Sequence, residues 1–240
     1  MSKINKKIAF IGAGNMGEAF VGALIQTGIF SPSMIYASDI SEKRLDILNK
    51  TYGISVMQNN FKVALLYNSL DNDSIEKLPI IRVMPNTPAL VLAGMSGMSA
   101  NKYTKAEDLN TIKIILEAIG KVIEFQEEDL DAEEEDLDAV TALSGSGPAY
   151  VFYIAEAMIE GGIKVGLEPD KAAMLTVATI QGALKLMEES NESPEILRRK
   201  VTSPGGTTEA AFKVLEKNRV KQNVIEAIKA ATIRSKELSR

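Results

Sequence analysis

The stretch that decides the fold lies near the N-terminus and reads Lys7-Ile8-Ala9-Phe10-Ile11-Gly12-Ala13-Gly14-Asn15-Met16-Gly17. A short apolar run leads directly into three glycines with the spacing Gly-x-Gly-x-x-Gly, and a helical pattern follows as far as Gly28. Asp39 stands 22 positions after Gly17, at the end of a second predicted strand over 34–38. A strand, a glycine turn, a helix and an acidic residue in this order are typical of a dinucleotide-binding βαβ unit.

The glycine turn is the first candidate site. Its backbone N–H groups stand at the start of a helix, where the helix dipole favours an anion such as a pyrophosphate. We therefore predict that the cofactor is contacted by Gly12, Gly14, Asn15, Met16 and Gly17. A purely structural turn with the same spacing is the alternative.

The end of the second predicted strand bears on the choice between NADH and NADPH. Asp39 suits the free ribose diol of NADH. A group of polar residues around it could instead hold the 2′-phosphate of NADPH, and this group comprises Ser38, Ser41, Lys43 and Arg44. The same group also fits an ordinary capped and charged helix start. Both cofactors stay open, with Ser38 and Asp39 as candidate contacts.

Strands and helices go on alternating beyond this unit, with a third strand predicted over 54–57 and a fourth over 79–84. From about residue 105 the apolar period is helical almost throughout. The pattern predicts an α/β Rossmann-like domain with a reduced parallel sheet over 1–100, followed by an all-α domain over 101–240.

The composition excludes several kinds of chemistry. The 240 residues include no histidine and no cysteine, so there is no imidazole base, no thiol nucleophile and no His- or Cys-ligated metal. The net charge of −5 gives no nucleic-acid footprint, and no apolar run is long enough for a membrane span. We expect a cytoplasmic protein, because the apolar N-terminal run continues into the glycine turn without a processing site.

Two further glycine-containing stretches could form sites. One is Leu143-Ser144-Gly145-Ser146-Gly147-Pro148-Ala149-Tyr150, and the other is Val201-Thr202-Ser203-Pro204-Gly205-Gly206-Thr207-Thr208. In the second, two glycines allow successive N–H groups to point into one concavity ahead of a helix, where a carboxylate could bind. An ordinary helix start is the alternative for each stretch.

A strongly acidic segment precedes the first of these stretches. Residues 124–138 hold ten acidic residues and no basic one, and they contain a near-repeat over 127–139. The loop glycine of an EF-hand is missing, so a solvated connector is favoured over a calcium site.

The three glycine stretches, together with Arg82-Val83-Met84-Pro85-Asn86-Thr87-Pro88-Ala89, closely resemble the pyrroline-5-carboxylate reductase family. The resemblance covers residues 5–60 and 79–236. It implies a Rossmann domain and an all-α dimerisation domain that interlocks with a partner subunit, giving a homodimer or a ring of dimers. It also implies hydride transfer from NADPH or NADH to the C=N carbon of the small-molecule substrate 1-pyrroline-5-carboxylate.

The family's functional residues match positions of this chain. The resemblance implies that Ser203, Gly205, Gly206 and Thr207 bind the substrate carboxylate and that Thr208 hydrogen-bonds the ring nitrogen. Asn60 matches a family cofactor contact, and Asn86, Thr87 and Pro88 match the loop beside the nicotinamide.

The chain departs from the family pattern between the third and fourth predicted strands. Family members carry two further strands there, with an Ala-Val-Lys-Pro stretch that lines the cofactor. Here the span is only residues 61–78, about 45 residues shorter. We therefore expect the strand over 79–84 to pair directly beside the strand over 7–11, with residues 61–78 as the crossover.

Other functions stay open. A cofactor-deficient helical dimer of the same family would explain the missing segment, and a reductase of another cyclic imine would share the carboxylate loop. A β-hydroxyacid dehydrogenase has the same two-domain plan, but its catalytic lysine position is occupied by Val151.

Overall fold

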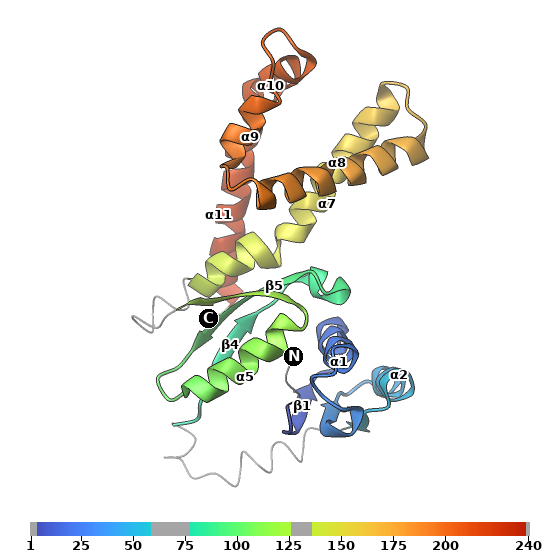
Figure 1. Cartoon of the computed structure of the whole chain (residues 1–240), viewed down its shortest axis with the longest axis vertical. Coiled ribbons are helices and arrows are strands. Elements are labelled where there is room, and N and C mark those ends of the chain that lie inside the picture. The colour runs from blue at the N-terminus through green and yellow to red at the C-terminus, as the bar shows by residue number, and fades with distance from the viewer. Residues whose placement is uncertain (1–3, 59–76, 126–135, 239–240) are drawn as a thin grey trace. The chain divides into compact units, whose positions relative to one another are not determined.

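The computed structural model describes residues 4–58, 77–125 and 136–238 (Figure 1). The chain divides into two compact units, one of Met1–Gly145 with Leu238–Arg240 and one of Ser146–Glu237. The predicted boundary after residue 100 therefore lies 45 residues too early. The reason is that α5 (Ala106–Glu117) leads into β6 (Gly120–Phe125), which pairs with a strand of the first unit.

The first sheet confirms the Rossmann-like start. Strands β1 (Ile8–Ile11), β2 (Ile35–Ser38) and β3 (Ser55–Met57) are parallel, with Ile8 opposite Ile35 and Tyr36 opposite Ser55. They are connected by α1 (Asn15–Gln26), by α2 (Glu42–Tyr52) and by the short η1 (Pro32–Met34). The core between them consists of fully buried aliphatic side chains, among them Leu24, Ile29, Ile35, Leu48 and Ile54.

The second sheet overturns the expected pairing of the fourth strand. Strand β4 (Ile81–Met84) runs antiparallel to β5 (Gly94–Ala100), and β5 runs parallel to β6. The prediction that β4 pairs beside β1 is wrong, because β5 follows β4 after only the short η2 (Thr87–Val91) and takes its hydrogen bonds. Among the described residues, β1 and β4 belong to different sheets.

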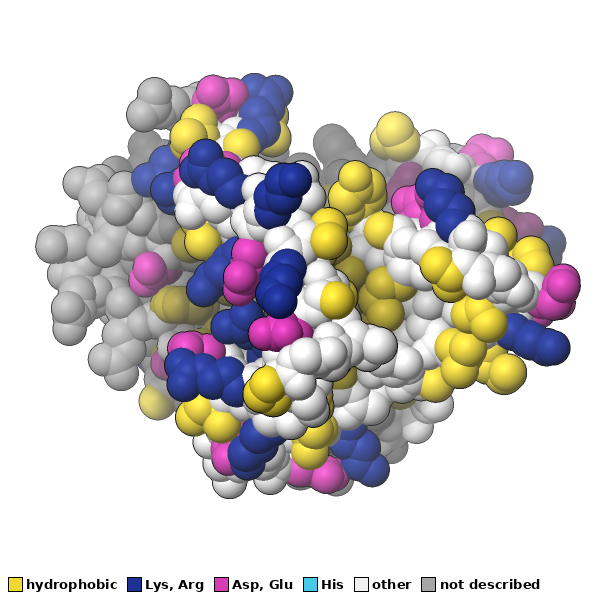
Figure 2. Space-filling view, turned by 90° about the horizontal axis from the view of Figure 1, so that it is seen from above, with side chains coloured by type: hydrophobic (Ala, Val, Ile, Leu, Met, Phe, Trp, Pro, Cys, Tyr) yellow, Lys and Arg dark blue, Asp and Glu magenta, His cyan; other side chains and the backbone are white. Residues whose placement is uncertain are grey.

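The second unit is entirely helical in its described residues. It contains α7 (Gly147–Lys164), α8 (Pro169–Glu189), α9 (Pro194–Lys200), α10 (Thr207–Lys217) and α11 (Val220–Leu238). Helices α7 and α8 approach closely at Gly162, where an added Cβ would lie 3.1 Å from Cβ of Ala172. Many large apolar side chains of this unit are nevertheless exposed, and hydrophobic groups are visible between charged ones at the surface (Figure 2).

Two absences can be stated for the described part of the chain. None of its helices is long and apolar enough to cross a membrane, and none of its acidic side chains form a cluster that could hold a metal ion. The acidic near-repeat over 127–139, where a calcium site was weighed, lies mostly outside the described residues.

Gly120 offers a test of the second sheet. Its φ is +154°, and a Cβ would lie 1.9 Å from the carbonyl oxygen of Gly94. We expect Gly120→Ala to lower the free energy of unfolding by about 3 kcal/mol, because the backbone of β5 or β6 must move. Urea denaturation measures this, with the exposed Glu124→Ala on the same strand as a control expected to change stability by about 0.5 kcal/mol or less. Equal stability of the two variants would contradict the pairing of β5 with β6.

Candidate functional site

The three glycines of the turn after β1 have three different structural roles. Gly12 adopts a φ of +104°, and its N–H donates to the carbonyl oxygen of Ser38 at 2.7 Å. Gly14 is the N-cap of α1, and an added Cβ would have no neighbour within 4 Å. At Gly17 a Cβ would lie 2.6 Å from the carbonyl oxygen of Gly12, so only glycine lets α1 approach this closely. The open side of Gly14 and the N-terminus of α1 therefore fit a pyrophosphate.

Two side chains hold the turn through Ala13. Its N–H donates to Oδ2 of Asp39 at 2.6 Å, and its carbonyl oxygen accepts from Nε of Arg44 at 2.7 Å. Arg44 also forms an ion pair of 2.6 Å with Glu18 of α1, in which both side chains are only 27% exposed. The glycine turn, α1 and the start of α2 are thus joined by one polar network.

Asp39 is the acidic residue that the spacing predicted at the end of β2. Its second oxygen, Oδ1, accepts from the N–H of Ser41 at 2.8 Å. The backbone N–H groups of Ala13 and Ser41 lower the pKa of this carboxyl below its ordinary value, so it is ionised near neutrality. A carboxylate has further lone pairs, so a ribose hydroxyl can still donate to it.

The other predicted cofactor residues of this region lie in different environments. Ser38 is 3% exposed, and its hydroxyl donates to the carbonyl oxygen of Phe10 at 3.4 Å, which places it inside the sheet. Asn15 is exposed on the first turn of α1, and Met16 packs partly against the core. Asn60 lies outside the described residues.

A cavity of about 370 Å³ lies beside the glycine turn. It is lined by glycines of the turn and by apolar residues of β1, α1, β4 and α5, among them Ile8, Phe10, Gly12, Gly17, Val83 and Pro85. Such a lining suits the face of a flat, weakly polar ring better than it suits a charged group.

The loop after β4 is fixed by Asn86. Its Oδ1 accepts from the N–H of Met95 at 2.8 Å, and its Nδ2 donates to the carbonyl oxygen and the hydroxyl of Ser144, both at 3.3 Å. Ser144 belongs to the π-helical turn η3 (Thr141–Gly145). The structure thus joins the loop of Asn86, Thr87 and Pro88 to the Ser-Gly-Ser-Gly stretch, a contact that the sequence did not predict.

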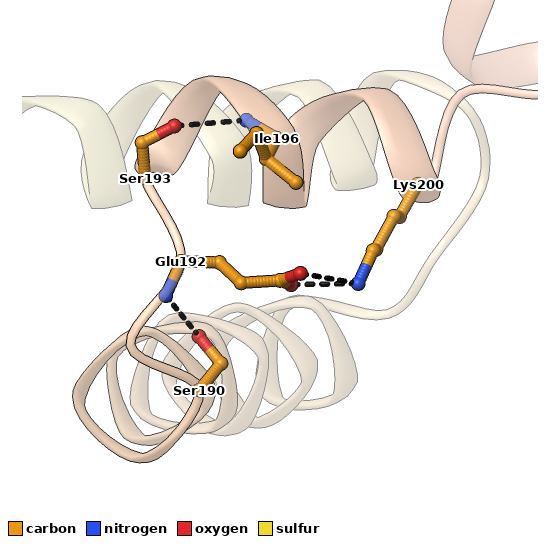
Figure 3. Close-up of polar contacts among 5 residues, drawn as sticks. All are labelled: Ser190, Glu192, Ser193, Ile196 and Lys200. Carbon is orange, nitrogen blue, oxygen red and sulfur yellow. Dashed lines mark hydrogen bonds and ion pairs between the residues drawn. The ribbon is translucent and has the colours of Figure 1, made fainter.

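The segment between α8 and α9 determines where α9 begins (Figure 3). The N–H of Glu192 donates to Oγ of Ser190 at 3.3 Å, and Ser193 caps α9 by accepting from the N–H of Ile196 at 3.4 Å. The carboxylate of Glu192 pairs with Nζ of Lys200 at 2.6 and 2.7 Å, which joins the two ends of α9. These contacts fix the residue at which the 201–208 loop begins.

The 201–208 loop leads into α10 through two glycines. Gly205 has a φ of +71°, and Gly206 is the N-cap of α10, with its own N–H donating to the carbonyl oxygen of Ser203 at 3.0 Å. The N–H of Gly205 donates to Oε2 of Glu209 at 3.0 Å. The first N–H groups of α10 have no partner within the helix, so an anion is favoured there.

The hydroxyls of this loop complete the predicted substrate site. Ser203 and Thr207 are exposed and Thr208 is half-buried at the first turn of α10. In the described parts of the chain no side-chain hydrogen bond engages these three hydroxyls. The N–H groups of Gly205 and Gly206 already donate to Glu209 and to Ser203, so the three hydroxyls are the groups of this loop that, within the described residues, have no side-chain hydrogen bond. Glu209 was not among the predicted residues.

Comparisons with known protein families match the N-terminal and the C-terminal parts of the chain separately. A family model for pyrroline-5-carboxylate reductase dimerisation matches residues 134–238, and one for coenzyme F420-dependent NADP oxidoreductases matches residues 7–66. The pyrroline-5-carboxylate reductase of Corynebacterium melassecola is 36% identical, over 97% of this chain and 98% of that protein.

Two solved structures are similar over the whole chain. The pyrroline-5-carboxylate reductase of Coxiella burnetii has a TM-score of 0.85 and 34% identity, covering 99% of this chain and 100% of that one. The Plasmodium falciparum pyrroline carboxylate reductase with NADP bound has a TM-score of 0.83 and 26% identity, covering 100% of both chains.

The alignment also measures the shortening. It spans 274 positions with the Corynebacterium melassecola protein, whereas 97% of 240 residues is about 233, so about 41 aligned positions have no residue in this chain. This number is close to the shortening of about 45 residues that the sequence predicts between its third and fourth strands.

Asp39→Asn tests whether the carboxylate of Asp39 stabilises the glycine turn. Because the folded pKa of Asp39 is depressed, its contribution to stability is present above the ordinary value of 3.8 and is lost as the pH falls through the folded pKa. We expect the variant to be less stable than the native chain at pH 7, and the difference to shrink below about pH 4. Urea denaturation between about pH 2 and pH 7 measures both effects.

The matched control for this experiment is Asp46→Asn. Within the described residues, the ion pair of Asp46 is with the exposed Lys50, one turn along α2 at 2.6 Å, and such pairs contribute little. If Asp39→Asn and Asp46→Asn have the same stability at pH 7, the carboxylate of Asp39 does not hold the turn.

Proposed function

Because the chain belongs to the pyrroline-5-carboxylate reductase family, we propose that it reduces the C=N bond of 1-pyrroline-5-carboxylate to give L-proline. The observation that carries the proposal is that one chain holds both a glycine turn with free space at Gly14 and, ahead of α10, a glycine loop with the exposed hydroxyls of Ser203 and Thr207. The cofactor of the family, NADPH or NADH, supplies the hydride when it is bound.

The first unit would hold the cofactor. Its pyrophosphate would lie on the N–H groups of the turn, at Gly12, Gly14, Asn15, Met16 and Gly17. Asp39 would accept from the ribose, whereas the buried Ser38 would support the end of β2. The nicotinamide ring would be positioned by the loop of Asn86, Thr87 and Pro88, which Ser144 holds. The apolar cavity beside Gly12 would exclude water from one face of this ring.

The 201–208 loop would hold the substrate. Ser203, Gly205, Gly206 and Thr207 would bind its carboxylate, and the hydroxyl of Thr208 would lie against the ring nitrogen. A cyclic imine is readily protonated near neutrality, so the protein needs to orient the ring and supplies no strong acid. This agrees with a chain that has no histidine and no cysteine.

The helical unit would complete the assembly. Its exposed apolar side chains include Phe152 at 68%, Tyr153 at 71% and Met174 at 68%, and a second copy of the chain would bury such faces. We propose a homodimer, and a ring of dimers as the larger assembly. We also propose that the protein acts in the cytoplasm.

The aligned positions that have no residue in this chain favour a second candidate function. A helical dimer of the same family that no longer binds cofactor would explain why about 41 aligned positions are absent. A reductase of a different cyclic imine would use the same loop, because a carboxylate site does not specify ring size.

Titration with NADPH and NADH, followed by cofactor fluorescence, separates the reductase from the cofactor-free dimer. We expect binding of at least one cofactor, and we expect Gly14→Ala to raise its Kd about tenfold because a methyl group would occupy the open side of the turn. Unchanged unfolding would show that the variant is folded. Absence of binding at millimolar cofactor would support the cofactor-free dimer.

Thr208→Ala tests the substrate site. We expect it to lower the rate of proline formation about 10- to 100-fold, since one hydrogen bond to a charged nitrogen is lost, without changing cofactor affinity. Thr208→Ser keeps the hydroxyl and should retain most of the activity. An unchanged rate for Thr208→Ala would remove this residue from the mechanism.

A further inference from the structure

The carboxylate of Glu209 accepts a hydrogen bond from the N–H of Gly205 in the 201–208 loop. Glu209 stands three positions after the N-cap Gly206, where a glutamate commonly reaches back to the N–H of the N-cap itself. Here that N–H already donates to Ser203, so the carboxylate passes the N-cap and accepts from the N–H of Gly205 at 3.0 Å. The donor that a substrate carboxylate would use is therefore bound to a carboxylate of the protein.

Two carboxylates cannot both take this position. The Gly205 N–H supplies a single proton, and like charges at hydrogen-bond distance repel. The side chain of Glu209 is 39% exposed, so it can rotate away without disrupting a core. An incoming carboxylate must therefore displace Glu209 before it can reach the loop.

Cations adjoin the position that Glu209 would leave. Nζ of Lys213, one turn along α10, lies 3.4 Å from Oε2 of Glu209. A cavity of about 290 Å³ is lined by Glu209 and Lys213 together with Arg198, Arg199 and Thr202. The lining also includes Glu216, which pairs with Arg198, and Arg199 pairs with Glu195. The cavity has room for the displaced side chain, and Lys213 is the cation that would hold it there.

We propose that Glu209 is a displaceable internal occupant of the substrate-carboxylate site: it competes with the substrate carboxylate for the N–H of Gly205 and so weakens the affinity of the site for carboxylate-bearing cyclic imines. This role rests on the proposed function of the loop. A substrate with a carboxylate replaces Glu209 on Gly205, and Lys213 retains the displaced side chain. A cyclic imine without a carboxylate leaves Glu209 in place.

The sequence offers a direct probe of this exchange. Pro204-Gly205 is the only Pro-Gly pair in the chain, so labelling proline carbonyls with ¹³C and glycine nitrogens with ¹⁵N gives one correlation, from the N–H of Gly205. Titration of the full-length protein with L-proline then measures carboxylate binding at this N–H.

We expect Glu209→Gln to bind L-proline about three- to tenfold more tightly than the native chain, because a neutral amide competes less well for the N–H. We expect Lys213→Met to bind it about threefold more weakly, and this effect to vanish when Glu209→Gln is also present. Glu226→Gln is the matched control: it removes the same charge from α11, where Glu226 pairs with the exposed Lys229 at 3.3 Å and does not line this cavity, and it should leave the affinity unchanged.

Steady-state kinetics give the second readout. Glu209→Gln should lower the KM for 1-pyrroline-5-carboxylate and leave the KM for 1-pyrroline, which has no carboxylate, unchanged. Equal or weaker proline binding by Glu209→Gln, or no response of the Gly205 signal in any variant, would overturn the inference. If proline binds as expected but the native chain reduces neither imine, the inference stands and the proposed reductase function fails.

Discussion

Side chains hydrogen-bond both backbone groups of Ala13, and the position of the glycine turn in the N-terminal unit depends on these two bonds. Asp39 accepts the N–H and Arg44 donates to the carbonyl oxygen, so the glycine turn is tied to the end of β2 and the start of α2. Arg44 is in turn paired with Glu18 of α1, and Gly17 lets that helix approach the turn. The direction of the N–H groups at the start of α1 depends on all of these contacts together, so the turn is preorganised for the proposed pyrophosphate contact.

Local contacts hold the parts of the first unit that line the candidate cofactor site. Strands β1 and β4 lie in separate sheets, and residues of both line the apolar cavity beside the glycine turn. The loop after β4 keeps its shape because Asn86 bonds to Met95 and to Ser144. The parts of the first unit that would face a cofactor are therefore held by contacts among the described residues.

Much of the fold follows from the sequence, for identifiable reasons. The β1-α1-β2-α2-β3 run was predicted because its strands are apolar and its turn carries spaced glycines, and the 201–208 loop because two glycines precede a helix. Strand β5 was not predicted, since Gly-Met-Ser-Gly-Met-Ser-Ala has no β-branched or aromatic residue, although most of it is buried. The misplaced domain boundary and the wrong partner for β4 both follow from that omission. Side-chain contacts over long separations, such as Asn86 with Ser144, carry no local signal at all.

The exposed apolar side chains on the helices of the second unit affect how a newly synthesised chain folds and how readily it is degraded. Among its described residues, only Ala172 and Thr176 are buried, so a single copy gains little from forming these helices by packing alone. Folding and association of this half are then one process, whose equilibrium depends on the concentration of chains. An unpaired chain presents apolar helices to proteases and chaperones, so we expect the amount of folded protein to rise more steeply than in proportion to the supply of chains.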